Sequence, residues 1–266
     1  MKHALEEWDF IESRIFSGKK IILLLDYDGT LTHIVENPGD AVLDGRIRSV
    51  LREISGYKQI VLGVLSGRRL ADVMELVGVN GIYYCGNHGL EVNGPGTEFM
   101  LEEEDFFREK ISSAVEVLRE SMKNQEGVSV EDKGLSVVVH YRRAVEEDAE
   151  AIQRVFMDSV KKHLESGFRV CKNKKTLELL PDTQYDKGTA VVEIKRQVEK
   201  EAGGDVRTIY VGDDATDEDA FRSLGENDVG IVVGRENSCA KYFLLDVSEV
   251  WKFLDKLRSS LQKTIE

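Results

Sequence analysis

Short apolar runs recur along the chain, and most of them end in small or acidic residues. They lie at residues 21–30, 60–67, 82–89, 208–216, 229–234 and 242–247. The runs do not alternate with polar positions and are rich in Val, Ile and Leu, which is typical of strands buried on both faces of a parallel sheet. Between them lie apolar residues at helical spacing, such as Ile47, Val50, Leu51 and Ile54. Strands that alternate with helices predict a doubly wound α/β core.

The alternation is interrupted between about residues 95 and 183. An amphipathic helical pattern at 107–122 leads into two short apolar runs, and a second helical pattern at 149–160 leads into two more. A helix–strand–strand pattern used twice predicts an antiparallel sheet with its helices on one face. Pro95 and Pro181 flank this segment. We therefore predict a core built from 1–94 and 184–266, with an inserted α+β cap domain at 95–183.

The composition is that of a folded globular protein, with 41% hydrophobic and 32% charged residues. No apolar run approaches the roughly 20 residues that a membrane span needs. The N-terminal segment lacks the long apolar stretch of a signal peptide, and its spacing predicts a short amphipathic helix with Trp8, Ile11 and Ile15 on the core. We expect a cytoplasmic protein with no membrane partner.

The formal net charge of −13 argues against nucleic acid as a partner, because a polyphosphate backbone is bound by basic surfaces. An acidic protein that binds a phosphate must offset the charge locally, with a metal ion, a lysine or a helix N-terminus. The three cysteines, Cys85, Cys171 and Cys239, are widely spaced and form no CxxC pair. We expect them to be buried, reduced thiols.

Polar residues follow several of the predicted core strands. They are Asp26 and Asp28, Ser66, Asn87 and His88, and Asp213 and Asp214. In a doubly wound sheet the carboxyl ends of parallel strands lie at one edge, where ligands bind. We therefore expect these side chains to converge.

Two acidic clusters, DYDGT and GDDATDED, come directly after strands of the same kind. An isolated Asp-Gly often only caps the structure that follows it. Two clusters that meet at one edge would repel each other unless a cation lay between them. All-oxygen ligands near a phosphate favour Mg²⁺ over zinc or copper.

Phosphoryl transfer needs a nucleophile, a proton donor for the leaving group and positive charge on the phosphoryl oxygens. Asp26 is the predicted nucleophile, and Asp28 is the predicted acid and base. Ser66 offers a hydroxyl and a backbone N–H at a helix start. Lys187, in DKGTA, offers a fixed positive charge, although most helical lysines only face water.

The order of these features resembles the four motifs of the haloacid dehalogenase superfamily. Within a match from about residue 20 to 245, the elements LDYDGTL, LSGR, GNHG with Glu91, EDKG followed by HYR, LELLP with KG, and GDDATDEDAF together resemble the trehalose-6-phosphate phosphatases. DxDGT alone marks only the superfamily, whereas GDDATDE and GNHG are narrower.

The resemblance implies a Mg²⁺ bound by the carboxylate of Asp26, the backbone carbonyl of Asp28 and Asp213, with Asp214 or Asp217 in support. It implies that Ser66 and Lys187 bind the phosphoryl group. It also implies polar residues that bind the sugar, namely Glu131, Lys133, His140, Arg142 and Glu178 on the cap and Arg68, Asn87 and His88 on the core. Glu131, Lys133 and Arg142 could each instead be a solvated strand residue.

The predicted function is hydrolysis of trehalose 6-phosphate through an aspartyl-phosphate intermediate, with a trehalose-phosphate synthase as a partner to be considered. A phosphatase for sucrose phosphate, or for a glucosyl- or mannosyl-glycerate phosphate, would use identical chemistry with a different cap. A phosphosugar mutase would have to return the phosphate. A non-catalytic regulator of a synthase should lack the nucleophile or a metal ligand, and Asp26, Asp28, Lys187 and Asp213 are all present.

Overall fold

A computed structural model describes residues 1–35, 38–100, 104–173 and 175–264. The contacts between residues divide the chain into two compact units. The first comprises Met1–Phe99 and Tyr185–Glu266, and the second is Met100–Gln184.

The first unit is built on a nine-stranded sheet with the strand order β1-β13-β12-β11-β2-β3-β4-β5-β6. The bounds are β1 Lys2–His3, β2 Lys20–Asp26, β3 Ile60–Leu65, β4 Tyr83–Gly86, β5 Glu91–Gly94, β6 Thr97–Met100, β11 Val206–Gly212, β12 Val229–Val233 and β13 Tyr242–Leu244. Strands β1 to β4 and β11 to β13 pair in parallel, and β5 pairs antiparallel with β4. The predicted parallel core is confirmed, whereas the short edge strand β1 was not predicted.

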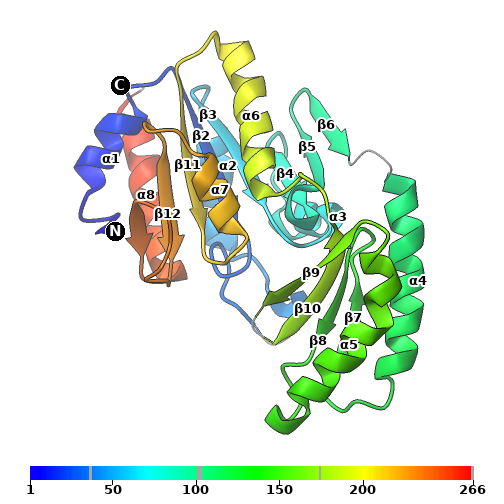
Figure 1. The fold of residues 1–266 in the computed structure, drawn as a ribbon. Helices are drawn as coiled ribbons and strands as arrows, with labels where there is room; N and C mark the ends of the chain where they lie inside the picture. The colour runs from blue at the N-terminus through cyan, green and yellow to red at the C-terminus, as the bar shows by residue number, and fades with distance from the viewer. Residues whose placement is uncertain (36–37, 101–103, 174, 265–266) are drawn as a thin grey trace. The chain divides into compact units, whose positions relative to one another are not determined.

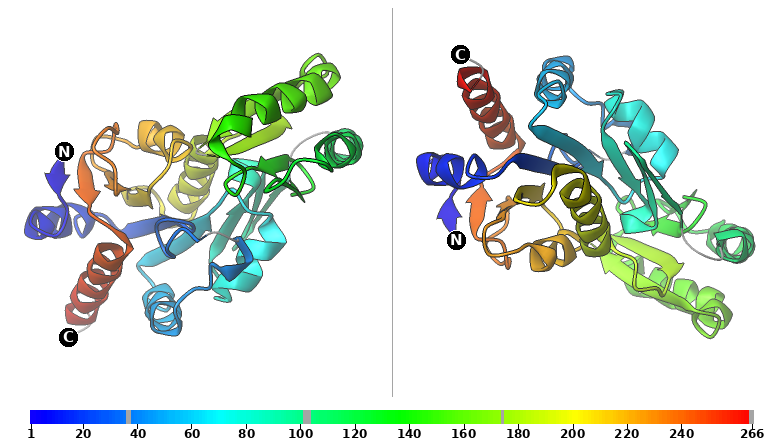
Figure 2. Two further views of the ribbon diagram at one scale, coloured as in Figure 1. Left: turned by 90° about the horizontal axis from the view of Figure 1, so that it is seen from below. Right: turned by 90° about the horizontal axis from the view of Figure 1, so that it is seen from above.

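Helices cover both faces of this sheet (Figures 1 and 2). One face packs against α1 (Trp8–Ile15), α2 (Gly45–Ser55), α3 (Leu70–Val77) and α8 (Val247–Lys263), and the other against α6 (Lys187–Ala202) and α7 (Asp217–Ser223). In β2, Leu23 and Leu25 enter the first core and Ile22 and Leu24 the second. Burial on both faces explains why the run is apolar without alternation. The predicted N-terminal helix is confirmed, with Trp8, Ile11 and Ile15 buried.

The second unit is an α+β domain with an antiparallel sheet in the order β7-β8-β10-β9. Its strands are β7 Ser129–Asp132, β8 Val137–His140, β9 Phe168–Asn173 and β10 Thr176–Pro181. Two helices, α4 (Glu104–Met122) and α5 (Ala149–Leu164), lie together on one face (Figure 1). The predicted use of helix–strand–strand twice is confirmed.

The strand order of the first sheet changes direction at one point. From β2 the chain builds outward through β3 and β4 on one side, and β11, β12 and β13 lie on the other. The order therefore reverses between β2 and β11, and ligands bind at such a switch point, beyond the carboxyl ends of the strands. Asp26 ends β2, and Asp213 follows directly after β11.

The cysteines differ from the expectation of three buried thiols. Cys85 is buried, Cys171 is partly buried and Cys239 is exposed, and none forms a disulfide. Among the helices of the described residues, none is long and apolar enough to cross a membrane.

Candidate active site

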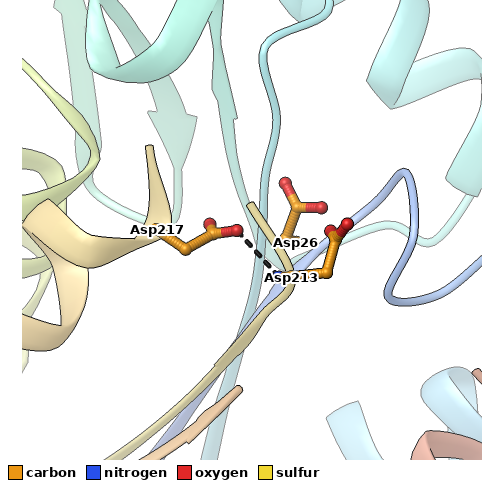
Figure 3. A group of neighbouring side chains, drawn as sticks. All are labelled: Asp26, Asp213 and Asp217. Carbon is orange, nitrogen blue, oxygen red and sulfur yellow. Dashed lines mark hydrogen bonds between the residues drawn. The ribbon is translucent and has the colours of Figure 1, made fainter. Parts of the chain in front are cut away.

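Three carboxylates gather at the switch point. They belong to Asp26 at the end of β2, Asp213 just beyond β11 and Asp217 at the start of α7. One oxygen of each lies within 4.8 Å of the others (Figure 3). The convergence predicted from the strand ends is present, and this arrangement could hold a metal ion.

Lys187 is the positive charge inside this cluster. It is the first residue of α6, whose N-terminus is fixed by a capping box between Asp186 and Thr189. Its Nζ donates to Asp26 Oδ1 and to Asp217 Oδ1, both at 2.7 Å. Burial alone would lower the pKa of Lys187, but the charges of Asp217 and Asp26 raise the pKa well above its ordinary value. The side chain is therefore a buried, permanently charged ammonium group.

Both carboxylate oxygens of Asp217 accept hydrogen bonds. Its Oδ1 accepts from Lys187 and, at 2.6 Å, from the hydroxyl of Tyr210, and its Oδ2 accepts from the backbone N–H groups of Asp213 and Asp214 at 2.9 Å each. Both Asp217 and Tyr210 are fully buried. Asp217 thus shapes the loop that carries Asp213 and fixes Lys187. Tyr210 was not anticipated from the sequence, where it reads as one more apolar strand residue.

Without a cation, the carboxyl groups of Asp26 and Asp213 are hard to ionise. Burial raises the pKa of Asp26 well above its usual range, Lys187 opposes the rise, and Asp217 and Asp213 add to it. Burial and the neighbouring charges of Asp217 and Asp214 raise the pKa of Asp213 to about 7. A divalent cation between them would favour the ionised forms.

Asp214 lies beside the cluster and is engaged elsewhere. Its Oδ1 accepts from the N–H of Thr216 at 2.8 Å and from the hydroxyl of Thr216 at 2.6 Å. Burial would raise its pKa, but Lys187 and the bonds from Thr216 hold the pKa well below the ordinary value. Asp214 is therefore an ionised cap of the turn before α7.

Asp28 forms a two-point ion pair with Arg68. Its two oxygens accept from Nε and Nη2 of Arg68, each at 2.7 Å. The guanidinium carbon of Arg68 lies 5.3 Å from the centre of the Tyr27 ring, which is close enough for a cation–π contact. The predicted acid and base group and the predicted substrate ligand therefore touch each other.

Ser66 and the segment GNHG meet beyond β3 and β4. Ser66 is buried, and its Oγ accepts from the N–H of Arg68 at 3.1 Å. Asn87 is only 1% exposed, and its amide donates to Glu91 at 2.5 Å. His88 is half-buried beside them.

The second unit brings together most of its predicted polar residues. His140 pairs with Glu131 at 2.6 Å, and Lys133 Nζ donates to Glu178 at 3.4 Å. Burial would raise the pKa of Glu131, but the hydrogen bond to His140 and the charge of Lys133 lower the pKa below its ordinary value. Ser136, which the sequence pattern does not single out, donates to Glu178 at 2.6 Å; its only sequence signal is a serine within an apolar run. Arg142 is exposed in the turn after β8.

Gly29 should be needed for the position of Asp213. It has φ 83°, and a Cβ there would overlap the carboxylate of Asp213. We expect Gly29→Ala to weaken divalent-cation affinity by about 10–100-fold, as displaced supporting groups do. Gly81→Ala is the matched control, because Gly81 has φ 76° with nothing within 4 Å of its Cβ. Both variants should lose about 1–2 kcal/mol of stability to the left-handed backbone, and calorimetric titration with Mg²⁺ should distinguish them. Equal Mg²⁺ affinities in the two variants would mean that a Cβ at position 29 does not displace the carboxylate of Asp213.

Cation binding should stabilise the protein increasingly as pH rises. Asp213 holds a proton in the folded state up to about pH 7, whereas in the unfolded chain it loses that proton near its ordinary value of 3.8. Without a cation, this group's contribution to stability is complete below the unfolded pKa and is lost as pH rises through the folded pKa. The gain in Tm on adding Mg²⁺ should therefore grow from about pH 5 to about pH 8. Asp213→Asn should remove the growth; a gain that is independent of pH in the unsubstituted protein would contradict the assignment.

Comparison with known proteins agrees with this arrangement. Residues 24–248 match the family model described as trehalose-phosphatase. The chain is 34% identical over 265 residues to trehalose-phosphate phosphatase B of Arabidopsis thaliana, an alignment that covers 93% of this chain and 69% of that protein.

Solved structures share the fold. The C-terminal domain of Candida albicans trehalose-6-phosphate phosphatase superposes with a TM-score of 0.81 at 21% identity, over 97% of this chain and 98% of that one. The C-terminal domain of the Candida albicans trehalose synthase regulatory protein gives 0.71 at 13% identity, over 93% and 97%. The predicted haloacid-dehalogenase-like α/β class is thereby confirmed. From the family match and the relatives at about a third identity, the chain belongs to the trehalose-phosphatase family and is a phosphoric monoester hydrolase.

Proposed function

We propose that the chain hydrolyses trehalose 6-phosphate to trehalose and inorganic phosphate, using Asp26 as nucleophile and Mg²⁺ as the cation. The observation that carries the proposal is the buried Asp26 carboxylate, bonded at 2.7 Å to Lys187 and flanked by Asp213, in a chain of this family.

The donor set fits a hard divalent cation. Three carboxylates lie within reach of one another, and burial together with the neighbouring carboxylates raises the pKa values of Asp26 and Asp213. Asp26 and Asp213 would hold the ion, together with the backbone carbonyl of Asp28, while Asp217 stays engaged with Lys187 and the loop. When bound, Mg²⁺ supplies charge neutralisation for the phosphoryl oxygens.

The chemical steps belong to the side chains. An Asp26 oxygen forms a bond to phosphorus while the bond from phosphorus to the sugar oxygen breaks, and Asp28 gives a proton to that oxygen. Water then attacks the aspartyl phosphate, Asp28 takes up a proton from the water, and the bond from Asp26 to phosphorus breaks to release phosphate. The Lys187 ammonium group and the Ser66 hydroxyl hold the phosphoryl oxygens.

Arg68 constrains the acid step. Its two bonds occupy both carboxylate oxygens of Asp28, so neither oxygen can reach the leaving group while the pair is intact. We expect the substrate phosphate to draw the guanidinium group of Arg68 away from Asp28, so that Asp28 is released as the phosphate binds.

Sugar recognition is assigned to the inserted segment, residues 95–183, acting as a cap. Its residues Glu131, Lys133, His140, Arg142 and Glu178 offer the charged and polar groups that orient a sugar, and His88 would add another from the core. The pairs His140–Glu131 and Lys133–Glu178 hold four of these side chains in fixed positions.

The competing functions are less well supported. A phosphatase for another sugar phosphate would share the core chemistry, but the relatives at about a third identity are named trehalose-phosphate phosphatases. A disabled regulator should lack part of the site, and Asp26, Asp28, Lys187 and Asp213 are all present. We place the protein in the cytoplasm, with a trehalose-phosphate synthase as the partner that supplies its substrate.

A release assay should establish the substrate. With Mg²⁺ restored after chelation, phosphate should be released from trehalose 6-phosphate in preference to sucrose phosphate and mannosyl-glycerate phosphate. Asp26→Asn keeps the shape of the site but cannot attack phosphorus, so its turnover should fall by more than about 10²–10⁴-fold. Substantial activity in that variant, or in excess chelator, would refute the mechanism; preference for another sugar phosphate would refute only the substrate.

The cap assignment predicts a loss that depends on the substrate. Lys133→Ala or Glu178→Ala should lower kcat/KM for trehalose 6-phosphate by the equivalent of about 1–3 kcal/mol, because a sugar hydroxyl is left buried without its partner. Hydrolysis of p-nitrophenyl phosphate, which has no sugar, should change little. Lys123→Ala is the matched control, since Lys123 is an exposed lysine of the same unit. If both substrates suffer equally, these residues serve the fold and not the sugar.

A further inference from the structure

The segment GNHG, residues 86–89, has a backbone that side chains rarely adopt. Asn87 and His88 are consecutive non-glycine residues with φ of 47° and 58°, and Gly89 follows with φ 114°. Left-handed backbone is disfavoured for residues with a Cβ and persists only where the surroundings hold it. The contacts of residues 86–89 should therefore show which groups stabilise this backbone and which groups it positions.

On one side the segment is bonded to the Ser66 loop. The N–H of Asn87 donates to the carbonyl of Arg68 at 2.7 Å, and the N–H of His88 donates to the carbonyl of Ser66 at 3.1 Å. The His88 ring lies against Gly67, where a Cβ would overlap it. The left-handed turn thus directs two backbone donors at the loop that carries Ser66.

On the other side the segment meets the start of α6. A Cβ on Gly89 would overlap the backbone of Asp186, the residue that caps α6 and precedes Lys187. One turn of four residues therefore lies between the two groups proposed to hold the phosphoryl oxygens, the hydroxyl of Ser66 and the ammonium group of Lys187.

Glu91 braces this turn. Its Oε2 accepts from the amide of Asn87 at 2.5 Å, and both side chains are buried, with exposed fractions of 8% and 1%. The bond links the first left-handed residue to the first residue of β5. The amide nitrogen of Asn87 is directed at Glu91, which argues against the sequence-based role of Asn87 as a sugar ligand.

We propose that Glu91 is a positioning residue. Acting through Asn87, it keeps residues 87–89 left-handed and so sets the distance between Ser66 and Lys187. The proposal rests on the proposed function, because it concerns the phosphate-holding part of that site. It extends the proposal by making Glu91 and Asn87 internal scaffolding of the phosphate site.

Three variants test the proposal. Glu91→Ala removes the acceptor, Glu91→Gln keeps one, and Asn87→Gly removes the amide while making the left-handed backbone free of strain. We expect Glu91→Ala and Asn87→Gly to lower kcat/KM for p-nitrophenyl phosphate by about 100-fold, as displacements of about 1 Å do. The loss should be the same for trehalose 6-phosphate, because the phosphate site is affected and the cap is not. Glu91→Gln should retain most activity.

The decisive variant is Asn87→Gly, because its activity and stability should separate. It should fall in activity without a lower Tm, since glycine relieves the backbone. Asp205→Gly is the matched control: Asp205 also has φ 59°, and it lies before β11, at the end of the sheet away from the site. Asp205→Gly should keep full activity.

A readout independent of turnover keeps the test separate from the proposed function. Amide hydrogen exchange should become faster at residues 66–68 in Glu91→Ala and Asn87→Gly and remain unchanged in Asp205→Gly. The positioning role is wrong if exchange and kcat/KM stay at wild-type values in both Glu91→Ala and Asn87→Gly. It is also wrong if activity falls only as far as Tm falls and Glu91→Gln gives no rescue. If the wild-type chain releases no phosphate but exchange at residues 66–68 is still faster in the two site variants, the proposed function is wrong and the positioning role of Glu91 is supported.

Discussion

The ammonium group of Lys187 between Asp26 and Asp217 is the interaction on which the rest of the site depends. Removing an ammonium ion and two carboxylates from water is costly, and their attraction offsets that cost only if the geometry is good and the remaining hydrogen-bonding positions are filled. The structure meets both conditions for Lys187 and Asp217. The lysine bonds are 2.7 Å long, and the other acceptor positions of Asp217 are filled by Tyr210 and by two backbone N–H groups. The loop that carries Asp213 thereby takes its shape from the same carboxylate that fixes the lysine.

That arrangement leaves a charge imbalance, which is the physical reason for a cation. Three carboxylates surround one ammonium group, and Asp214 is ionised beside them. The protein alone can reduce the imbalance only by keeping protons on Asp26 and Asp213, as their raised pKa values indicate. A net charge of −13 is therefore compatible with phosphate binding. Local positive charge comes from Lys187, from Arg68 and from the ion that the carboxylates would bind, and not from the surface as a whole.

The fold was largely predictable because β2 and its neighbours are buried on both faces, which leaves an unbroken apolar run. The two-residue strand β1 left no such signal, because two residues cannot show a period. The convergence of Asp26, Asp213 and Lys187 followed from strand ends and motif order. What each carboxylate does could not be predicted, since Asp214 and Asp217 differ only in which N–H and O–H groups point at them. Those directions depend on the backbone of the loop. The same limit applies to Glu91 and Ser136, whose partners lie on other turns or strands.

In the proposed function, the first unit carries out phosphoryl transfer and the second unit selects the sugar. A TM-score of 0.71 to the C-terminal domain of a trehalose synthase regulatory protein, at 13% identity, shows that the fold alone does not determine the function. In the first unit, Asp26, Lys187 and Asp217 are buried and bonded in one network, so a change in one of them disturbs the others. In the second unit, four of the proposed sugar ligands form two pairs, one between the neighbouring strands β7 and β8 and one from the turn after β7 to β10. Pairs of that kind can be replaced one at a time without disturbing the core network. Relatives can therefore differ in the sugar they accept while keeping the same phosphoryl chemistry.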